Sequence, residues 1–92
     1  MLSNHYIMNI EESKEVLTNQ YEEIVEDVKK GEYLSANMVR VMLNLKSASD
    51  LADLYWSKKD YFNYKTFALL AYKYYKIKDT ISDAMQEKFN YN

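Results

Sequence analysis

The sequence contains almost none of the residues that build tight turns. Its 92 residues include one glycine and no proline, whereas average proteins contain about 7% glycine and about 5% proline. Glycine and proline supply the backbone angles that many short turns require. A fold of many short strands joined by hairpins is therefore excluded, and we expect long helices with few connections between them.

The same scarcity limits the chemistry. Without cysteine the chain cannot form disulfides, thiolate zinc sites or cysteine nucleophiles. The single histidine, His5, cannot by itself complete a zinc site, a di-iron site or a Ser-His-acid triad. One glycine is too few for a phosphate-binding loop. We therefore expect that the protein is not an enzyme and that it uses no metal and no cofactor.

Capping residues divide the chain into three helices. Asn9 and Glu12 have the spacing of a capping box, and Gly31 can end the same helix, which predicts a first helix over about residues 10–30. Ser35 is the expected N-cap of a second helix over about residues 35–58. Asp60 is the expected N-cap of a third helix over about residues 61–88.

Two further features bear on the domain organisation. Asp79 and Thr80 both favour cap positions, which would allow the third helix to split near residue 79. Residues 1–8 carry no helix signal, and we interpret them as a flexible lead-in, within which Met8 is an alternative start. Residues 9–92 then form a single helical domain.

Apolar residues recur at intervals of three and four along each expected helix, which is the period of a helix with one buried face. In the first helix they are Leu17, Tyr21, Ile24 and Val28. In the second they are Met38, Val41, Leu45, Ala48, Ala52 and Tyr55, beside a second stripe of Leu43, Leu51 and Leu54. In the third they are Phe67, Leu70, Tyr74, Ile77, Ile81 and Ala84, beside Tyr64, Ala68, Ala71 and Tyr75. This pattern predicts an all-α fold, a small antiparallel three-helix bundle with the second helix in the centre.

Size and composition suggest how the protein exists in the cell. A chain this short buries only about 60–65% of its unfolded surface, so we expect a homodimer or a higher homo-oligomer. No apolar run is long enough to span a bilayer and the N-terminus has no signal-peptide pattern, so we expect a cytoplasmic protein without membrane contact. The high content of Lys, Asn, Ile and Tyr suggests AT-rich codons, and with them a bacterial host or a phage or mobile element within it.

The first helix is acidic. Residues 1–30 carry seven acids and three lysines, whereas residues 61–92 carry three acids and five lysines. Several acids stand four residues apart, where like charges repel, so we expect a positive group to lie opposite them. One interpretation is an acidic docking face formed by Glu22, Glu23, Glu26 and Asp27. The alternative is a solvated face whose repulsion is relieved by neighbouring lysines.

Aromatic residues concentrate around the expected turn between the second and third helices, where nine of them fall within residues 55–75. They could form the core, a protein interface, or a stacking platform for single-stranded nucleic acid. The third interpretation would use Lys65, Lys73, Lys76 and Lys78. It is weakened by the net charge of −2 and by the presence of a single arginine.

Four aromatic residues lie off the main apolar seams and are our candidate contacts with a partner: Trp56, Tyr61, Phe62 and Tyr72. Lys58 and Lys59 stand beside them at the turn. We therefore expect a small inhibitor, adaptor or regulator that binds a larger protein through this aromatic surface. The alternatives are an accessory protein that binds single-stranded nucleic acid and, more weakly supported, a virion or scaffolding component. No motif in the sequence identifies a known family.

Overall fold

The computed structural model describes residues 9–89, and in this range the chain forms helices and turns without strands. The helices are α1 (Ile10–Lys30), α2 (Leu34–Ser57) and α3 (Tyr61–Phe89). The predicted all-helical fold with three helices is confirmed. The predicted lead-in at residues 1–8, including Met8, lies outside the described residues. None of the described helices is both long enough and apolar enough to cross a bilayer.

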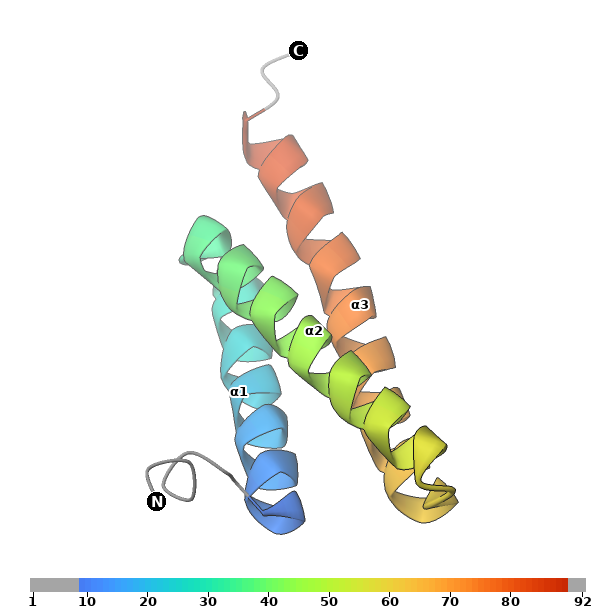
Figure 1. Ribbon diagram of the computed structural model, residues 1–92. Helices are drawn as coiled ribbons and strands as arrows, with labels where there is room; N and C mark the ends of the chain where they lie inside the picture. The colour runs from blue at the N-terminus through green and yellow to red at the C-terminus, as the bar shows by residue number, and fades with distance from the viewer. Residues whose placement is uncertain (1–8, 90–92) are drawn as a thin grey trace, which may run out of the picture.

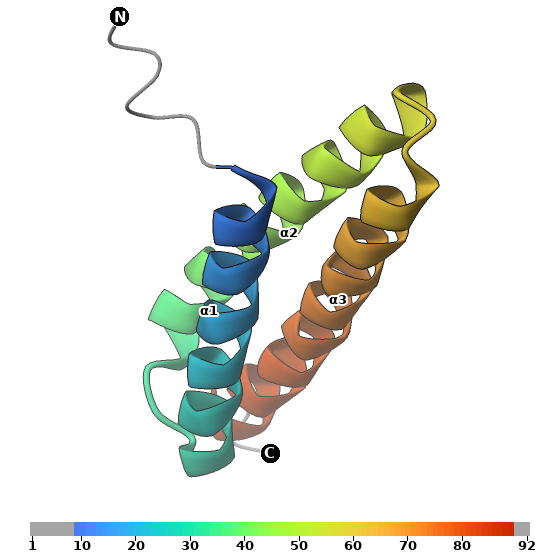
Figure 2. The same cartoon turned by 90° about the horizontal axis from the view of Figure 1, so that it is seen from below.

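Consecutive helices run in opposite directions, so α1 and α3 point the same way (Figures 1 and 2). Most contacts between helices join α2 to α3, and α1 lies against this pair. In Figure 1, α2 crosses in front of the other two helices. The packing is therefore dominated by the α2–α3 pair, and α1 contacts both of these helices about equally.

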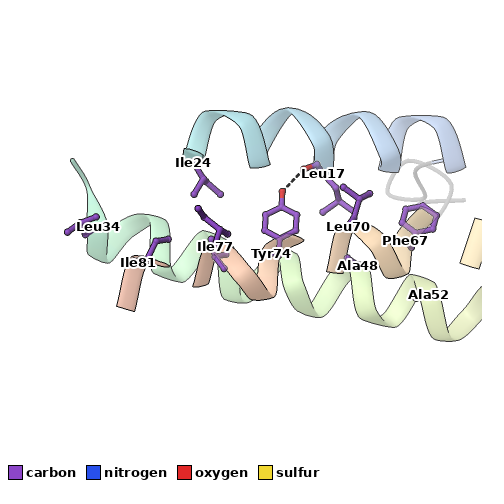
Figure 3. Close-up of a cluster of buried hydrophobic side chains, with 11 residues drawn as sticks. Leu17, Ile24, Leu34, Ala48, Ala52, Phe67, Leu70, Tyr74, Ile77 and Ile81 are labelled. Atoms are coloured by element: carbon purple, nitrogen blue, oxygen red, sulfur yellow. Dashed lines mark hydrogen bonds between the residues drawn. The ribbon is translucent and has the colours of Figure 1, made fainter. Parts of the chain in front are cut away.

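The core follows the apolar seams. Its buried members are Leu17, Ile24, Leu34, Val41, Ala48, Ala52, Phe67, Leu70, Tyr74, Ile77 and Ile81 (Figure 3). Small residues lie in this core on both helices: α2 contributes the buried Ala48 and Ala52, and α3 the half-buried Ala68 and Ala71. Such small side chains let two helix backbones approach closely, which agrees with the predominance of the α2–α3 contact.

The contact between α1 and α2 is largely polar. Three side-chain hydrogen bonds cross it, in which Asn37 donates to Asp27 (2.9 Å), Arg40 to Glu23 (3.0 Å) and Asn44 to Gln20 (2.8 Å). The donors on α2 and the acceptors on α1 are both spaced by three or four residues, so the bonds form a row along the interface. This row favours one register of α1 on α2, beside the core to which Leu17 and Ile24 of α1 also belong.

Tyr74 connects all three helices. Its ring is completely buried and meets Tyr21 of α1 edge-on, with ring centroids 5.6 Å apart. Its hydroxyl donates a hydrogen bond to the Leu17 carbonyl of α1 (Figure 3) and accepts one from Asn44 Nδ2 of α2 at 3.4 Å. A buried phenol needs such partners because an unpaired hydroxyl is costly away from water.

Two sequence predictions about helix ends are wrong. Ser35 does not cap α2, because Tyr33 takes the left-handed conformation (φ 55°) and its carbonyl accepts from Asn37 N at 2.8 Å. The helix thus begins at Leu34, whose side chain is buried in the core. The third helix does not split near residue 79. It runs on through Asp79, because Ile77 and Ile81 anchor both sides of this exposed stretch.

We expect an alkaline loss of stability that originates at Tyr74. Burial raises the pKa of Tyr74 from 10.0 to about 12, so the unfolded chain releases the phenolic proton at lower pH than the folded chain does. The associated stability is complete below pH 10 and is lost as the pH rises from 10 to 12. Two pKa units correspond to roughly 2–3 kcal/mol. Urea unfolding followed by circular dichroism across this range measures it.

The control is Tyr74→Phe, which keeps the ring and removes the ionisable group. We expect a loss of about 1 kcal/mol at neutral pH, because the hydrogen bond to Leu17 disappears. The alkaline decline should be much smaller in this variant than in the wild type. Equal declines in the two proteins would contradict the assignment to Tyr74.

Candidate functional site

The turn between α2 and α3 is closed by hydrogen bonds and contains no glycine. Lys59 N donates to the Trp56 carbonyl at 3.0 Å and Asp60 N donates to the Tyr55 carbonyl at 2.9 Å, which is the pattern of a Schellman motif. In that motif the residue at the position of Lys59 is left-handed, and Lys59 has φ 60°. Glycine is the usual choice there, and Gly31 (φ 70°) fills the equivalent place at the end of α1.

Asp60 caps α3, as the sequence predicts. Its carboxylate accepts from Asn63 Nδ2 at 2.7 Å and from Asn63 N at 3.3 Å. These hydrogen bonds, first that of the side chain and then that of the backbone, lower the pKa of the Asp60 carboxyl below 3.8. The turn is therefore fixed on both sides, and the side chains on either side of it are held in defined positions.

Three rings gather on one side of this turn, and we call Trp56, Tyr61 and Tyr64 the turn cluster. The Trp56 ring lies 5.3 Å from that of Tyr61 and 5.0 Å from that of Tyr64, at interplanar angles of 63° and 59°. Trp56 is 57% exposed and Tyr61 is 50% exposed. The structure thus brings two of the four predicted contact residues together and leaves both accessible.

The two predicted turn lysines flank the cluster. Lys58 and Lys59 are exposed, and Lys58 Nζ lies 5.7 Å from the centroid of the Tyr55 ring. Tyr55 itself stacks on the buried Phe67, with centroids 5.7 Å apart and an angle of 11° between the rings. A cation over the open face of an aromatic ring is favourable. The ammonium group of Lys58 is therefore held in place by the Tyr55 ring, which the buried Phe67 supports.

The other two predicted contact residues lie along the exposed side of α3. Phe62 is 76% exposed and Tyr72 is 58% exposed, and both belong to an exposed line of residues spaced by three or four along α3. We call this line the α3 strip: Phe62, Lys65, Leu69, Tyr72 and Lys76. Phe62 and Leu69 border a shallow groove of about 560 Å³ around Lys65. Lys14 of α1 approaches the Phe62 ring, 5.4 Å from its centroid.

The four lysines assigned to nucleic-acid binding do not share one face. Lys65 and Lys76 belong to the α3 strip, and Lys76 Nζ lies 6.0 Å from the Tyr72 centroid. Lys73 lies over Tyr21 of α1 at 5.7 Å, whereas Lys78 lies over Tyr75 at 4.7 Å. The positive charge of α3 is therefore spread around the helix.

The predicted acidic docking face also divides. Glu23 and Asp27 face α2, where Glu23 pairs with Arg40 and Asp27 accepts from Asn37. Glu22 and Glu26 remain on the outside. The positive group that the sequence predicts opposite the acids is thus Arg40, the single arginine.

Sequence reasoning missed two exposed leucines. Leu43 was expected in the second apolar stripe of its helix and is 65% exposed, because α1 and α3 both contact other faces of α2. Leu69 is 57% exposed. Its spacing from Phe62 and Tyr72, seven and three residues, is the signal that places it on the same strip. Within residues 9–89 no group of three or more His, Cys, Asp or Glu side chains is placed to hold a metal ion.

We expect Lys59→Gly to stabilise the protein by about 0.5–1 kcal/mol. A residue with a side chain costs roughly 1–2 kcal/mol in the left-handed conformation, and glycine avoids this cost. The unfolded chain of the glycine variant is more flexible, which offsets part of the stabilisation. The reverse change at the equivalent position, Gly31→Ala, should cost about 1 kcal/mol; there the strain acts alone, since no atom lies within 4 Å of the added methyl group. Urea unfolding midpoints measure both.

The matched control is Lys58→Gly. Lys58 is right-handed (φ −83°), so glycine relieves nothing there and should destabilise the protein. A stabilising effect at Lys58, or none at Lys59, would show that the left-handed strain is not the cause.

In sequence the chain matches no protein family model. Neither curated proteins nor solved structures give a significant match. The geometry of the turn cluster and of the α3 strip is therefore the ground on which a function is inferred.

Proposed function

We propose that the protein is a small non-catalytic interaction module, an inhibitor, adaptor or regulator, that binds a larger protein through the turn cluster. The observation that carries this proposal is the contact of Trp56 with Tyr61, both half-exposed, at a turn closed by hydrogen bonds. Trp and Tyr are the residues that most often dominate the energy of protein interfaces. Two such rings, already in contact and accessible, supply the centre of a binding surface.

The rigidity of the turn supports the same proposal. Binding costs free energy whenever mobile side chains must be ordered. Trp56 and Tyr64 hold each other in place, and Asp60 fixes the start of α3 through its bonds with Asn63. The cluster therefore loses little freedom when a partner covers it.

The charge around the turn indicates the kind of partner. Lys58 and Lys59 are exposed at the same turn, with Lys58 over the Tyr55 ring, so an acidic rim around an apolar centre on the larger protein would complement this surface. Lys59 also retains a left-handed conformation that glycine would adopt more easily. Strain of this kind tends to persist at functional sites, which fits a role for the lysine side chain in binding.

Single-stranded nucleic acid is the alternative partner, and the geometry favours it less because the lysines of α3 lie on different faces. Nucleic-acid binding by this route weakens steeply as salt rises. A salt series with a labelled single-stranded oligonucleotide separates this alternative from binding to a protein. A virion or scaffolding role would instead place the protein in purified particles.

The proposal is tested by affinity capture from a lysate of the producing cell, with quantitative mass spectrometry of the retained proteins. Trp56→Ala and Tyr61→Ala should each lose a protein that the wild type retains, by at least roughly tenfold, because truncating a central interface residue costs about 2 kcal/mol or more. Helicity and thermal stability should stay near those of the wild type, since both rings are half-exposed.

Tyr33→Ala is the matched control. Tyr33 is also an exposed tyrosine beside the start of a helix, but it lies at the other connection, between α1 and α2. It should retain the captured protein. Retention of the same proteins by all variants, or unfolding of Trp56→Ala, would contradict the assignment of the turn cluster as the binding surface.

A further inference from the structure

The outer face of α1 is a line of acidic residues that neither of the other helices uses. We call it the α1 strip: Glu11, Glu15, Thr18, Glu22 and Glu26, all of them exposed. The helix contacts α2 through Glu23 and Asp27 and meets α3 through Tyr21. Within residues 9–89, Glu11 and Glu26 form ion pairs with lysines of their own helix alone, at 3.3 and 4.0 Å.

The α3 strip has the opposite character, because it is basic and apolar. Its two lysines lie among three apolar or aromatic residues, Phe62, Leu69 and Tyr72, each of which is more than half exposed. Among the described residues, the ion pairs all use cations of α1 or α2, so no lysine of α3 is paired with a carboxylate. Among these residues, therefore, no ion pair joins the acidic α1 to the basic α3 within the subunit.

The charges on the two strips have the same spacing. Lys65 and Lys76 are eleven residues apart, and so are Glu11 and Glu22. Glu15 and Glu26 repeat this interval. Eleven residues make about three helical turns, a rise of about 16.5 Å, and bring the two charges back to one face of the helix. Two carboxylates of one strip can therefore meet both lysines of the other at once, with Thr18 leaving room for the larger side chains between the lysines.

The placement of the strips allows this contact to form twice. α1 and α3 run in the same direction (Figure 2), and their strips lie outside the contacts that each makes with α2. Within the subunit, Tyr21 lies at the level of Tyr74 and Lys14 at the level of Phe62, so the two strips cover the same length of the molecule. A two-fold axis across them would set each α1 antiparallel to the α3 of the other copy.

We infer that a second copy of this chain docks on the α3 strip through its α1 strip, and that the reciprocal contact closes a symmetric dimer. A two-fold contact of this kind uses the same two surfaces on both subunits and cannot grow into a fibre. Burial of Phe62, Leu69 and Tyr72 would supply apolar contact, and the Lys–Glu pairs would set the orientation. This assigns Phe62 and Tyr72 to the dimer, while Trp56 of α2 stays outside it and Tyr61, eleven residues before Tyr72, borders it. The inference thus goes beyond the proposed function and does not depend on it.

Sedimentation equilibrium tests the dimer directly. At low ionic strength and high protein concentration the wild type should have twice the monomer mass of 11.0 kDa. High salt should weaken the dimer by roughly tenfold or more, because exposed ion pairs are screened. A wild-type protein of monomer mass at low salt, or a dimer indifferent to salt, would overturn the inference.

Charge reversal identifies the surfaces. Lys65→Glu with Lys76→Glu gives one double variant, and Glu11→Lys with Glu22→Lys, a pair with the same eleven-residue spacing, gives another; each should be monomeric alone. Mixed in equal amounts they should form a heterodimer, because in one contact the native charge pairs then meet, and in the other the reversed pair on α1 meets the reversed pair on α3. Restoration on mixing also shows that both variants are folded. Failure of the mixture to associate would overturn the inference.

The matched control reverses two lysines away from the strips. Lys58→Glu with Lys59→Glu changes the net charge by the same amount and should leave the dimer intact, and so should Trp56→Ala. Dissociation by the control pair would mean that net charge alone governs association, and would overturn the assignment to the α3 strip. A dimer that persists in Trp56→Ala while capture of the larger protein is lost separates this inference from the proposed function.

Discussion

The fold depends on one buried phenol. Tyr74 of α3 reaches the Leu17 carbonyl of α1 and the Asn44 amide of α2, and its ring lies among the core residues (Figure 3). A buried hydroxyl must be hydrogen-bonded, and these partners exist only when all three helices are correctly placed. The apolar seams bring the helices together, but the seams alone would also allow one helix to shift by a turn along its neighbour. Tyr74, with the row of polar contacts between α1 and α2, selects one register.

This arrangement leaves particular surfaces uncovered. Because α1 lies against α2 through polar pairs and against α3 through Tyr21, its outer carboxylates have no cation of another helix beside them. Near the connecting turn Tyr55 and Phe67 fill the space between α2 and α3, and Trp56 and Tyr61 remain half-exposed. The turn cluster and the two charged strips thus follow from how the core is built, and the turn cluster lies at the end of α3 where the α3 strip begins. One molecule has room for a larger partner at the turn and for a second copy along α1 and α3.

Much of the fold could be predicted from the sequence. The residues of the apolar seams, such as Ile24, Val41 and Phe67, are buried because helical periodicity alone determines which face is apolar. The caps at Asn9, Gly31 and Asp60 form as predicted because each is a local interaction. Ser35 fails as a cap because the burial of Leu34, a tertiary effect, outweighs a local preference.

The candidate site was harder to predict. Its residue types and their concentration near residue 60 are visible in the sequence, and the scarcity of glycine already requires a turn there made from Lys58, Lys59 and Asp60. The sequence by itself therefore determined three helices, their buried faces and the place of that turn, since these depend on contacts close along the chain. Only the tertiary structure decided that Trp56 of α2 packs against Tyr61 and Tyr64 of α3, and that Arg40 meets Glu23. Those outcomes depend on how each helix is rotated about its axis relative to its neighbours. That rotation is set by packing between residues far apart in the chain.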